Sequence, residues 1–310
     1  KYFEKYDRHL VLYGSYGPLL NTTEFRYSNR FTTNEQLRIR SRCSEYLSLS
    51  ANFRKLSFSY SFAMNALNLP DSIFAKFNSY GSSYTLGRFY FRGTYRSVTG
   101  ISKYDTSSPD TSVTDAFHPY RNHVKNTQLN LLTVFLFKKG YSYTVPYSNT
   151  YKIKNSGGSF LAYTQPYYWK AQTEGALINE MDGSPSRSFA GNMPNRIRTT
   201  GMRFGLGFVY HLTGKHFFWS QTGAAGMDLQ MNAIRSDSET RNSFQIKPAM
   251  MADFILGWNF DYFFFSYAFN FKFNFLGDDK LDVRDLYFVN SLKLGFRIPV
   301  IKKQKEDVKN

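Results

Sequence analysis

Residue types that serve metal binding, acid–base catalysis or nucleophilic attack are few and scattered in this chain of 310 residues. His211 and His216 stand five residues apart, a spacing that a metal pair could use, but no cysteine and no carboxylate stands beside them. Asp228 and Asp253 lie inside alternating segments, where pairing with Arg and Lys accounts for them better than acid–base catalysis does. We therefore expect no metal site and no catalytic residue.

Two groups of glycines, at 201–207 and 223–226, could be compared with phosphate-binding loops. Neither stands between a strand and a helix, which P-loops and dinucleotide sites require, so we expect no cofactor. The net charge of +16 would suit a nucleic-acid partner, but the basic residues do not gather in a recognisable binding module. We therefore expect no nucleic-acid partner.

An aromatic alternation dominates the end of the chain. Every second residue is aromatic: Phe263, Phe265, Tyr267, Phe269, Phe271, Phe273 and Phe275. A strand sends successive side chains to opposite faces, so one face here is an aromatic wall, which we assign to lipid. The segment is slightly longer than the ~9–11 residues that a tilted strand needs to cross a bilayer. The pattern predicts a transmembrane β-strand.

Four further segments repeat this alternation of apolar residues with small or charged ones: Leu56–Met64, Met202–Leu212, Ile246–Trp258 and Leu292–Val300. No run of about 18 apolar residues exists to form a transmembrane helix, so a closed barrel remains as the spanning structure. We predict an all-β fold, a transmembrane antiparallel up-and-down β-barrel of about 12 strands, within a range of about 10–14. Residues 1–300 form this single barrel, and residues 301–310 form a charged periplasmic tail.

Connections set the orientation, because short turns lie at the periplasmic end of such barrels and long loops lie outside. Tight turns are expected at 52–55, 138–140, 212–215 and 259–261, and both termini are expected to be periplasmic. A further strand is expected over residues 141–151. The long polar stretches 104–126 and 173–195 are placed outside the cell.

Charged residues on the polar face of the strands are assigned to the barrel lumen. Arg88, Arg92 and Arg96, for example, share one parity over Tyr84–Ser97. The lumenal charges that we predict are Arg38, Arg40, Arg42, Arg88, Arg92, Arg203, Asp228, Lys247, Asp253, Lys272, Lys293 and Arg297.

The run Asn155–Leu161, which follows Tyr141-Ser142-Tyr143, resembles a signature of an uncharacterised family of outer-membrane β-barrels of about 300 residues from Bacteroidota. That family has a K-S-A-G-S-F-L run after an N-x-x-F-S-Y strand start; here Asn155 replaces the lysine and Gly157 the alanine. The resemblance implies an outer-membrane location and a barrel fold, and it brings no catalytic residue. Because a barrel must reach the outer membrane, we also expect that a secretory signal has been removed.

Three function classes remain. We expect a non-enzymatic accessory or structural subunit of a larger outer-membrane assembly for protein assembly, export or uptake. The alternatives are a small, weakly anion-preferring pore and a barrel-type lipid-modifying enzyme. Tyr163-Thr164-Gln165 resembles a tripeptide of outer-membrane phospholipases, but none of the 5 histidines is followed closely by the Ser-Asn pair that such enzymes also need.

The two long stretches combine apolar residues with acidic ones in an otherwise basic chain. The predicted anchors for a protein partner are Phe117, Tyr120, Leu177, Ile178 and Met181. The expected partners are therefore outer-membrane lipid, lipopolysaccharide and other outer-membrane or surface proteins.

Overall fold

The computed structural model describes residues 3–5, 9–29, 32–64, 76–99, 102–105, 125–143, 151–172, 194–236, 239–278 and 281–300. These residues are organised almost entirely as β-strands, and none of them forms a helix long and apolar enough to cross a membrane. The strands are β1 (Phe3–Lys5), β2 (His9–Asn29), β3 (Thr32–Phe53), β4 (Leu56–Met64), β5 (Lys76–Leu86), β6 (Phe89–Thr99), β7 (Ser102–Asp105), β8 (Lys125–Leu136), β9 (Tyr151–Ile153), β10 (Gly157–Gln172), β11 (Pro194–Thr213), β12 (Phe217–Ser236), β13 (Thr240–Asn259), β14 (Phe263–Gly277) and β15 (Leu281–Pro299).

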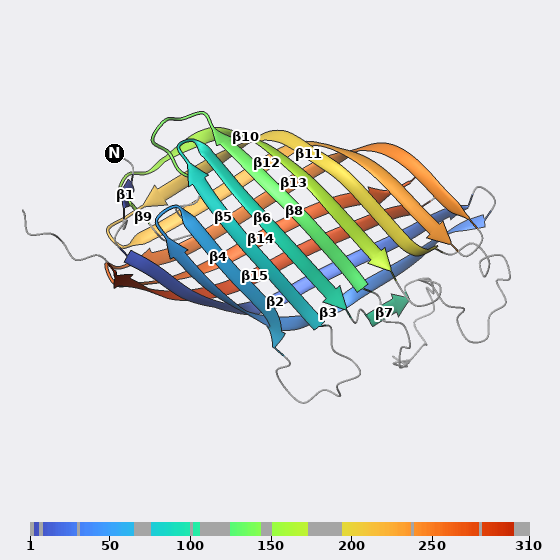
Figure 1. Ribbon diagram of the computed structural model, residues 1–310, viewed down its shortest axis with the longest axis horizontal. Coiled ribbons are helices and arrows are strands. Elements are labelled where there is room, and N and C mark those ends of the chain that lie inside the picture. Colours follow the sequence, from blue (N-terminus) through green and yellow to red (C-terminus); the bar gives the residue numbers. More distant parts are fainter. Residues whose placement is uncertain are drawn as a thin grey trace, which may run out of the picture.

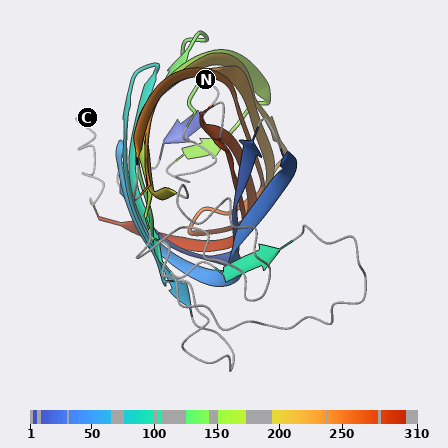
Figure 2. The ribbon, with the colours of Figure 1, turned by 90° about the vertical axis from the view of Figure 1, so that its right-hand side faces the viewer.

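Twelve of these strands close a barrel, shown from the side in Figure 1 and along its axis in Figure 2. The ring runs β2-β3-β4-β5-β6-β8-β10-β11-β12-β13-β14-β15, and every neighbouring pair is antiparallel. The last strand closes on the first, with Pro299 opposite His9 and Leu281 opposite Tyr27. Closure leaves no strand edge to lipid. The predicted fold class and strand number are confirmed.

The barrel walls differ in length. Strands β4, β5, β6 and β8 have 9 to 12 residues, whereas β2, β3, β11, β12 and β13 have 20 to 22. Because about 9–11 residues suffice to cross the hydrocarbon layer, the long strands continue past it. They do so at the end opposite the termini, where the long connections 65–75, 106–124 and 173–193 lie outside the described residues.

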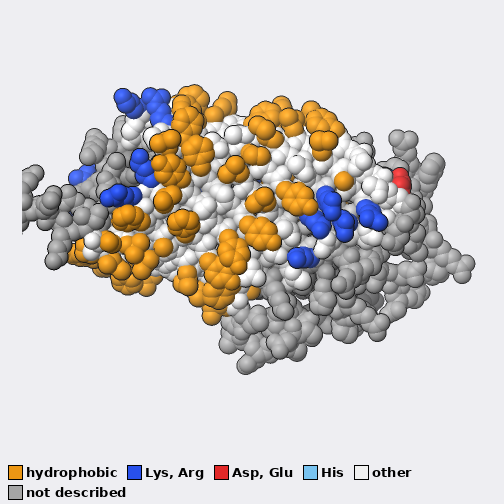
Figure 3. Space-filling model, in the orientation of Figure 1, with side chains coloured by type: hydrophobic (Ala, Val, Ile, Leu, Met, Phe, Trp, Pro, Cys, Tyr) orange, Lys and Arg blue, Asp and Glu red, His pale blue; other side chains and the backbone are white. Residues whose placement is uncertain are grey.

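The alternation of faces appears in the first half of β14, whereas the side chains from Phe269 to Phe275 are all half-buried, and the assignment of Phe269, Phe271, Phe273 and Phe275 to lipid stays a prediction. On β14, Phe263, Phe265 and Tyr267 are exposed on the outer face, while Phe264 and Ala268 are fully buried inside. Apolar side chains are spread over the visible wall in Figure 3, among polar side chains and backbone. The residue pairs of adjacent strands keep this parity, as when Phe265 stands opposite Trp258 on β13. A lipid-facing belt therefore surrounds the barrel.

The segment 137–156 corrects one sequence expectation. The proposed strand over 141–151 is not part of the barrel where the structure describes it: Tyr141–Tyr143 carry no strand structure, and Tyr151 belongs to β9, which pairs with β1 outside the barrel sheet; residues 144–150 lie outside the described residues. The β1–β9 ribbon lies at the termini end of the barrel in Figure 1 and inside the ring in Figure 2. Tyr141 and Tyr143 are buried because they turn into the lumen, where Tyr143 packs on Tyr90 with ring centroids 5.0 Å apart.

A second correction concerns the expected strand through Arg88. The chain reverses at Gly87, whose φ is +60°, and β5 and β6 form a hairpin around Gly87 and Arg88. Glycine suits this turn because it adopts positive φ without steric cost. Arg88 is therefore exposed at the turn, where its Nη1 donates to the Phe137 carbonyl oxygen at 3.4 Å. Its assignment to the lumen was wrong.

Two apolar clusters divide the lumen along the barrel axis. The proximal layer, near the termini, includes Tyr90 and Ala268, whereas the distal layer includes Val98 and Leu276. Both β6 and β14 pass from one layer to the other through polar residues. The stretch between the two layers holds the candidate site.

Candidate functional site: a cationic chamber in the lumen

A cavity of about 200 Å³ lies inside the barrel between the proximal and distal layers. On β6 its lining runs Arg92, Thr94 and Arg96, and on β14 it includes Asn270 and Lys272. Among the described residues that line it, none is a carboxylate and five carry a positive charge: Arg92, Arg96, Arg203, Lys272 and Lys293. We call this cavity the chamber.

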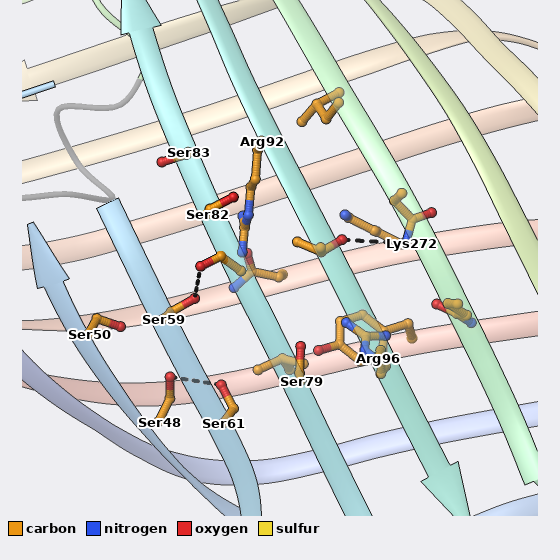
Figure 4. A pocket seen from close by; sticks show the side chains of 18 of the residues that line it. Ser48, Ser50, Ser59, Ser61, Ser79, Ser82, Ser83, Arg92, Arg96 and Lys272 are labelled. Atoms are coloured by element: carbon orange, nitrogen blue, oxygen red, sulfur yellow. Dashed lines mark hydrogen bonds between the residues drawn. The ribbon is translucent and has the colours of Figure 1, made fainter. Parts of the chain in front are cut away.

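Small hydroxyls form one wall of the chamber (Figure 4). They come from the inner faces of β3, β4 and β5 and comprise Ser48, Ser50, Ser57, Ser59, Ser61, Ser79 and Ser83. Some bind each other across strands, as Ser61 Oγ donates to Ser48 Oγ at 2.8 Å. A Cβ added at Gly81 would lie 2.5 Å from Ser59 Oγ, so β4 and β5 have little room for larger side chains here. The short serine side chains leave space in front of the cations.

The cations project from β6, β11, β14 and β15 into the same space, and Arg92 is exposed even though it points into the barrel. Arg96 stacks over the Tyr287 ring, with its Cζ 3.7 Å from the centroid. The Nζ of Lys293 lies 6.0 Å from the Tyr13 ring centroid. Aromatic faces stabilise these positive charges without neutralising them.

Asp228 neutralises one of the five cations. Arg203 Nε lies 3.0 Å from Asp228 Oδ2, which also accepts hydrogen bonds from the Tyr167 hydroxyl at 2.9 Å and Gln230 Nε2 at 3.2 Å. Arg203 Cζ also lies 4.0 Å from the Tyr167 ring centroid. Several partners fix this buried ion pair, as a desolvated pair requires.

Two further carboxylates lie beside the chamber. The negative charge of Asp253 attracts three cations of the chamber, namely Arg92, Lys272 and Lys293. Asp285 Oδ2 accepts from Gln128 Nε2 at 3.2 Å and from Asn274 Nδ2 at 3.0 Å. Counted over the described residues, the five lining cations therefore outnumber these three carboxylates by two.

Most of the predicted lumenal charges lie on the inner face. Those that line the chamber or lie beside it are Arg92, Arg203, Asp228, Asp253, Lys272 and Lys293. Lys247 stands opposite Asp228 on the neighbouring strand, and cross-strand partners share a face. Arg297 is buried near the termini, where it binds the Asn259 side chain and packs 5.1 Å from the Phe264 ring centroid.

The remaining predicted site residues lie outside what the structure describes. Arg38, Arg40 and Arg42 belong to β3, but their side chains are not described. The β2–β3 pairing shifts register there, from Leu19 opposite Ser44 to Asn21 opposite Ser41. Their lumenal position stays a prediction. The docking residues Phe117, Tyr120, Leu177, Ile178 and Met181, and the tail 301–310, also lie outside the described residues.

One contact that sequence reasoning missed fastens the inserted segment to the barrel wall. His211 Nδ1 lies 2.7 Å from Ser220 Oγ, and its Nε2 lies 3.4 Å from the Ser142 carbonyl oxygen. The ring also stacks on Tyr141, with centroids 4.9 Å apart. This histidine, considered above as a metal ligand, therefore holds Tyr141–Tyr143 inside the lumen. Among the described residues there is no group of three or more His, Cys, Asp and Glu that could bind a metal.

A family model for a domain of unknown function, DUF4421, matches residues 1–297. The chain belongs to this family. No curated protein matches its sequence.

Solved outer-membrane barrels are similar to the chain at low identity. The outer-membrane protease OmpT from Escherichia coli has 10% identity and a TM-score of 0.42, over 95% of this chain and 98% of that one. Ail, the attachment invasion locus protein of Yersinia pestis, has 9% identity and a TM-score of 0.19, over 92% and 99%. The P. putida toluene transporter TodX has 7% identity and a TM-score of 0.24, over 94% and 90%.

The comparisons correct the expectation that this chain is not an enzyme. The solved barrels similar to it include a protease, so the architecture does not exclude catalysis, and the exclusion made from sequence was wrong. The architecture itself, that of an outer-membrane β-barrel, agrees with the sequence prediction.

Proposed function

We propose that this protein is an outer-membrane barrel whose lumen binds small anionic solutes and lets them pass. The observation that carries the proposal is the chamber, whose described lining has five cations and no carboxylate. Rings of Arg and Lys select anions in pores, because fixed positive charge lowers the energy of an anion in a narrow passage. The serine hydroxyls opposite can donate further hydrogen bonds to the same anion.

The dimensions of the chamber restrict the solute. A volume of about 200 Å³ equals roughly seven water molecules at ~30 Å³ each. Inorganic phosphate, small carboxylates and halides match this size, whereas an oligosaccharide does not. The proximal and distal layers narrow the passage on either side, so we expect a small conductance. This function is the small anion-preferring pore considered from the sequence, now with a defined chamber.

Planar-bilayer recordings test the proposal. With a KCl gradient across the membrane, the reversal potential of the wild-type protein should have the sign of a chloride-selective pathway. Replacing Arg92, Lys272 and Lys293 by Gln should move it to zero or reverse its sign, because the three positive charges removed exceed the excess of two over the carboxylates. The matched control replaces Lys55, Lys139 and Lys215 by Gln; these lysines are exposed in turns near the termini, and their loss should leave the potential unchanged. Folded protein that never conducts would contradict the proposal.

The accessory-subunit hypothesis depends on residues 106–124 and 173–193, which the structure does not describe, and it stays a prediction. Deleting residues 176–183 and comparing the proteins that co-purify from native membranes tests it directly. Recovery of the same companions with and without this segment would exclude docking through it.

A further inference from the structure

Five basic residues gather on the outer surface at the distal ends of four adjacent strands. They are Lys125 on β8, Lys170 on β10, Arg196 and Arg198 on β11, and Arg235 on β12. Their neighbours Asn126, Trp169, Ala171, Ile197 and Ile234 are buried inside the barrel, so the five side chains point outward. They correspond to the basic patch over the right-hand ends of these strands in Figure 3. We call these five residues the outer basic patch.

The pairing of the strands brings like charges together. Lys170 stands directly opposite Arg198, and Arg196 stands opposite Arg235. Electrostatic repulsion also acts on Lys170 from the positive charges of Arg196, Arg198 and Lys125. Like charges directly opposite each other destabilise a sheet. Within the part of the chain that the structure describes, none of the five pairs with a carboxylate.

The patch adjoins the lipid-facing belt. On β11 the outward residues are apolar from Leu212 to Met202, and they are followed by Thr200, Arg198 and Arg196. The ten residue steps from Leu212 to Met202 span roughly 34 Å along the strand, or about 25 Å along the membrane normal at a tilt of ~40°. This equals the height of the apolar band in outer-membrane barrels. Arg198 and Arg196 therefore stand at the level of the lipid headgroups.

The headgroups concerned are those of the outer leaflet. The patch lies at the end opposite the termini and opposite the tight turns at 54–55, 214–216 and 260–262. Short turns mark the periplasmic end, so the patch faces the other leaflet. A lipid bound here lays its acyl chains on the belt, including the exposed Met202 and Phe204, while its headgroup reaches the cations.

We propose that the outer basic patch binds the phosphate groups of a phosphorylated glycolipid of the outer leaflet. Guanidinium groups hold phosphate by paired hydrogen bonds, and the lysines add charge. The site is separate from the chamber, because its residues face away from the lumen. Its test therefore stands or fails independently of the proposed transport function.

The experiment measures lipid binding to the intact barrel in phosphatidylcholine nanodiscs. Bis-phosphorylated lipid A is titrated, with dephosphorylated lipid A and inorganic phosphate as separate arms. One variant carries K170Q, R196Q and R198Q; the control carries K55Q, K139Q and K215Q, which remove the same charge from exposed turns near the termini. A further variant, R196K with R198K, keeps the charge of the patch.

Each basic residue at an anionic membrane surface contributes about fivefold to binding, so the triple patch variant should bind lipid A on the order of 100-fold more weakly. The control and the R196K/R198K variant should bind within about threefold of wild type, and dephosphorylated lipid A should bind weakly to all four proteins. Equal binding by the patch variant and wild type, or equal binding of the two lipids, would overturn the proposal. Inorganic phosphate that binds as tightly as lipid A would also overturn it, in favour of a soluble-anion site.

Discussion

The lipid-facing belt makes a quantitative prediction about depth on a single strand face. Leu206 and Thr200 both point outward from β11, and both are exposed. Leu206 lies next to the midpoint of the apolar run 202–212, and Thr200 lies six residues farther along the strand. Six residues span about 20 Å, which is roughly 15 Å along the membrane normal at a tilt of ~40°. Thr200 is therefore outside a belt whose half-height is about 12 Å.

Arginine at these two positions should lower the free energy of unfolding by very different amounts. An arginine at the midplane of a barrel costs ~2–4 kcal/mol, whereas one near the interface costs ~0–1 kcal/mol. Leu206→Arg should therefore lower the free energy of unfolding by about 2–3 kcal/mol more than Thr200→Arg. Reversible denaturant unfolding of the protein in lipid vesicles measures both values. Equal costs for the two variants, or a larger cost for Thr200→Arg, would refute the placement of the belt on β11.

Two further predictions concern the lumen. Asp228→Ala should lower the free energy of unfolding by ~3–5 kcal/mol, because it leaves Arg203 buried without its ion-pair partner; Asp282→Ala, which breaks a more exposed ion pair, should cost less than ~1 kcal/mol in the same denaturant assay. Tyr143→Ala should raise single-channel conductance, because it removes a ring packed inside the proximal layer, and an unchanged or lower conductance in folded protein would show that this segment does not narrow the passage.

The barrel itself could be predicted because alternate residues of a membrane strand face lipid and lumen, and the two sets therefore differ in polarity. Phe263–Phe275 is a period-two pattern, and closure follows because lipid leaves no other way to satisfy the strand edges. The same rule misled at Tyr141-Ser142-Tyr143, which alternates like a strand although its rings pack inside the lumen. It also misled at Arg88, where Gly87 turns the chain.

The chamber could not be predicted as a unit. The serines at 57, 59 and 61 are visible in the sequence as one small, polar face, and Lys272 is visible as a charge on another strand. That both line one cavity depends on the number of strands, their stagger and the closure of β15 on β2. The alternation of residues within one strand does not reveal which distant strands pair with each other. The outer basic patch was missed for the same reason, because its five residues come from four strands.

The location of bound halide in the lumen tests the central claim most directly. Crystals of the protein soaked in sodium bromide would be measured at the bromine absorption edge, so that anomalous density marks each bound anion. We predict a bromide ion in the chamber, within contact distance of Arg92, Lys272 or Lys293. Bromide found only on the outer surface, with none in the chamber of a well-ordered crystal, would contradict the proposal that this lumen binds anions.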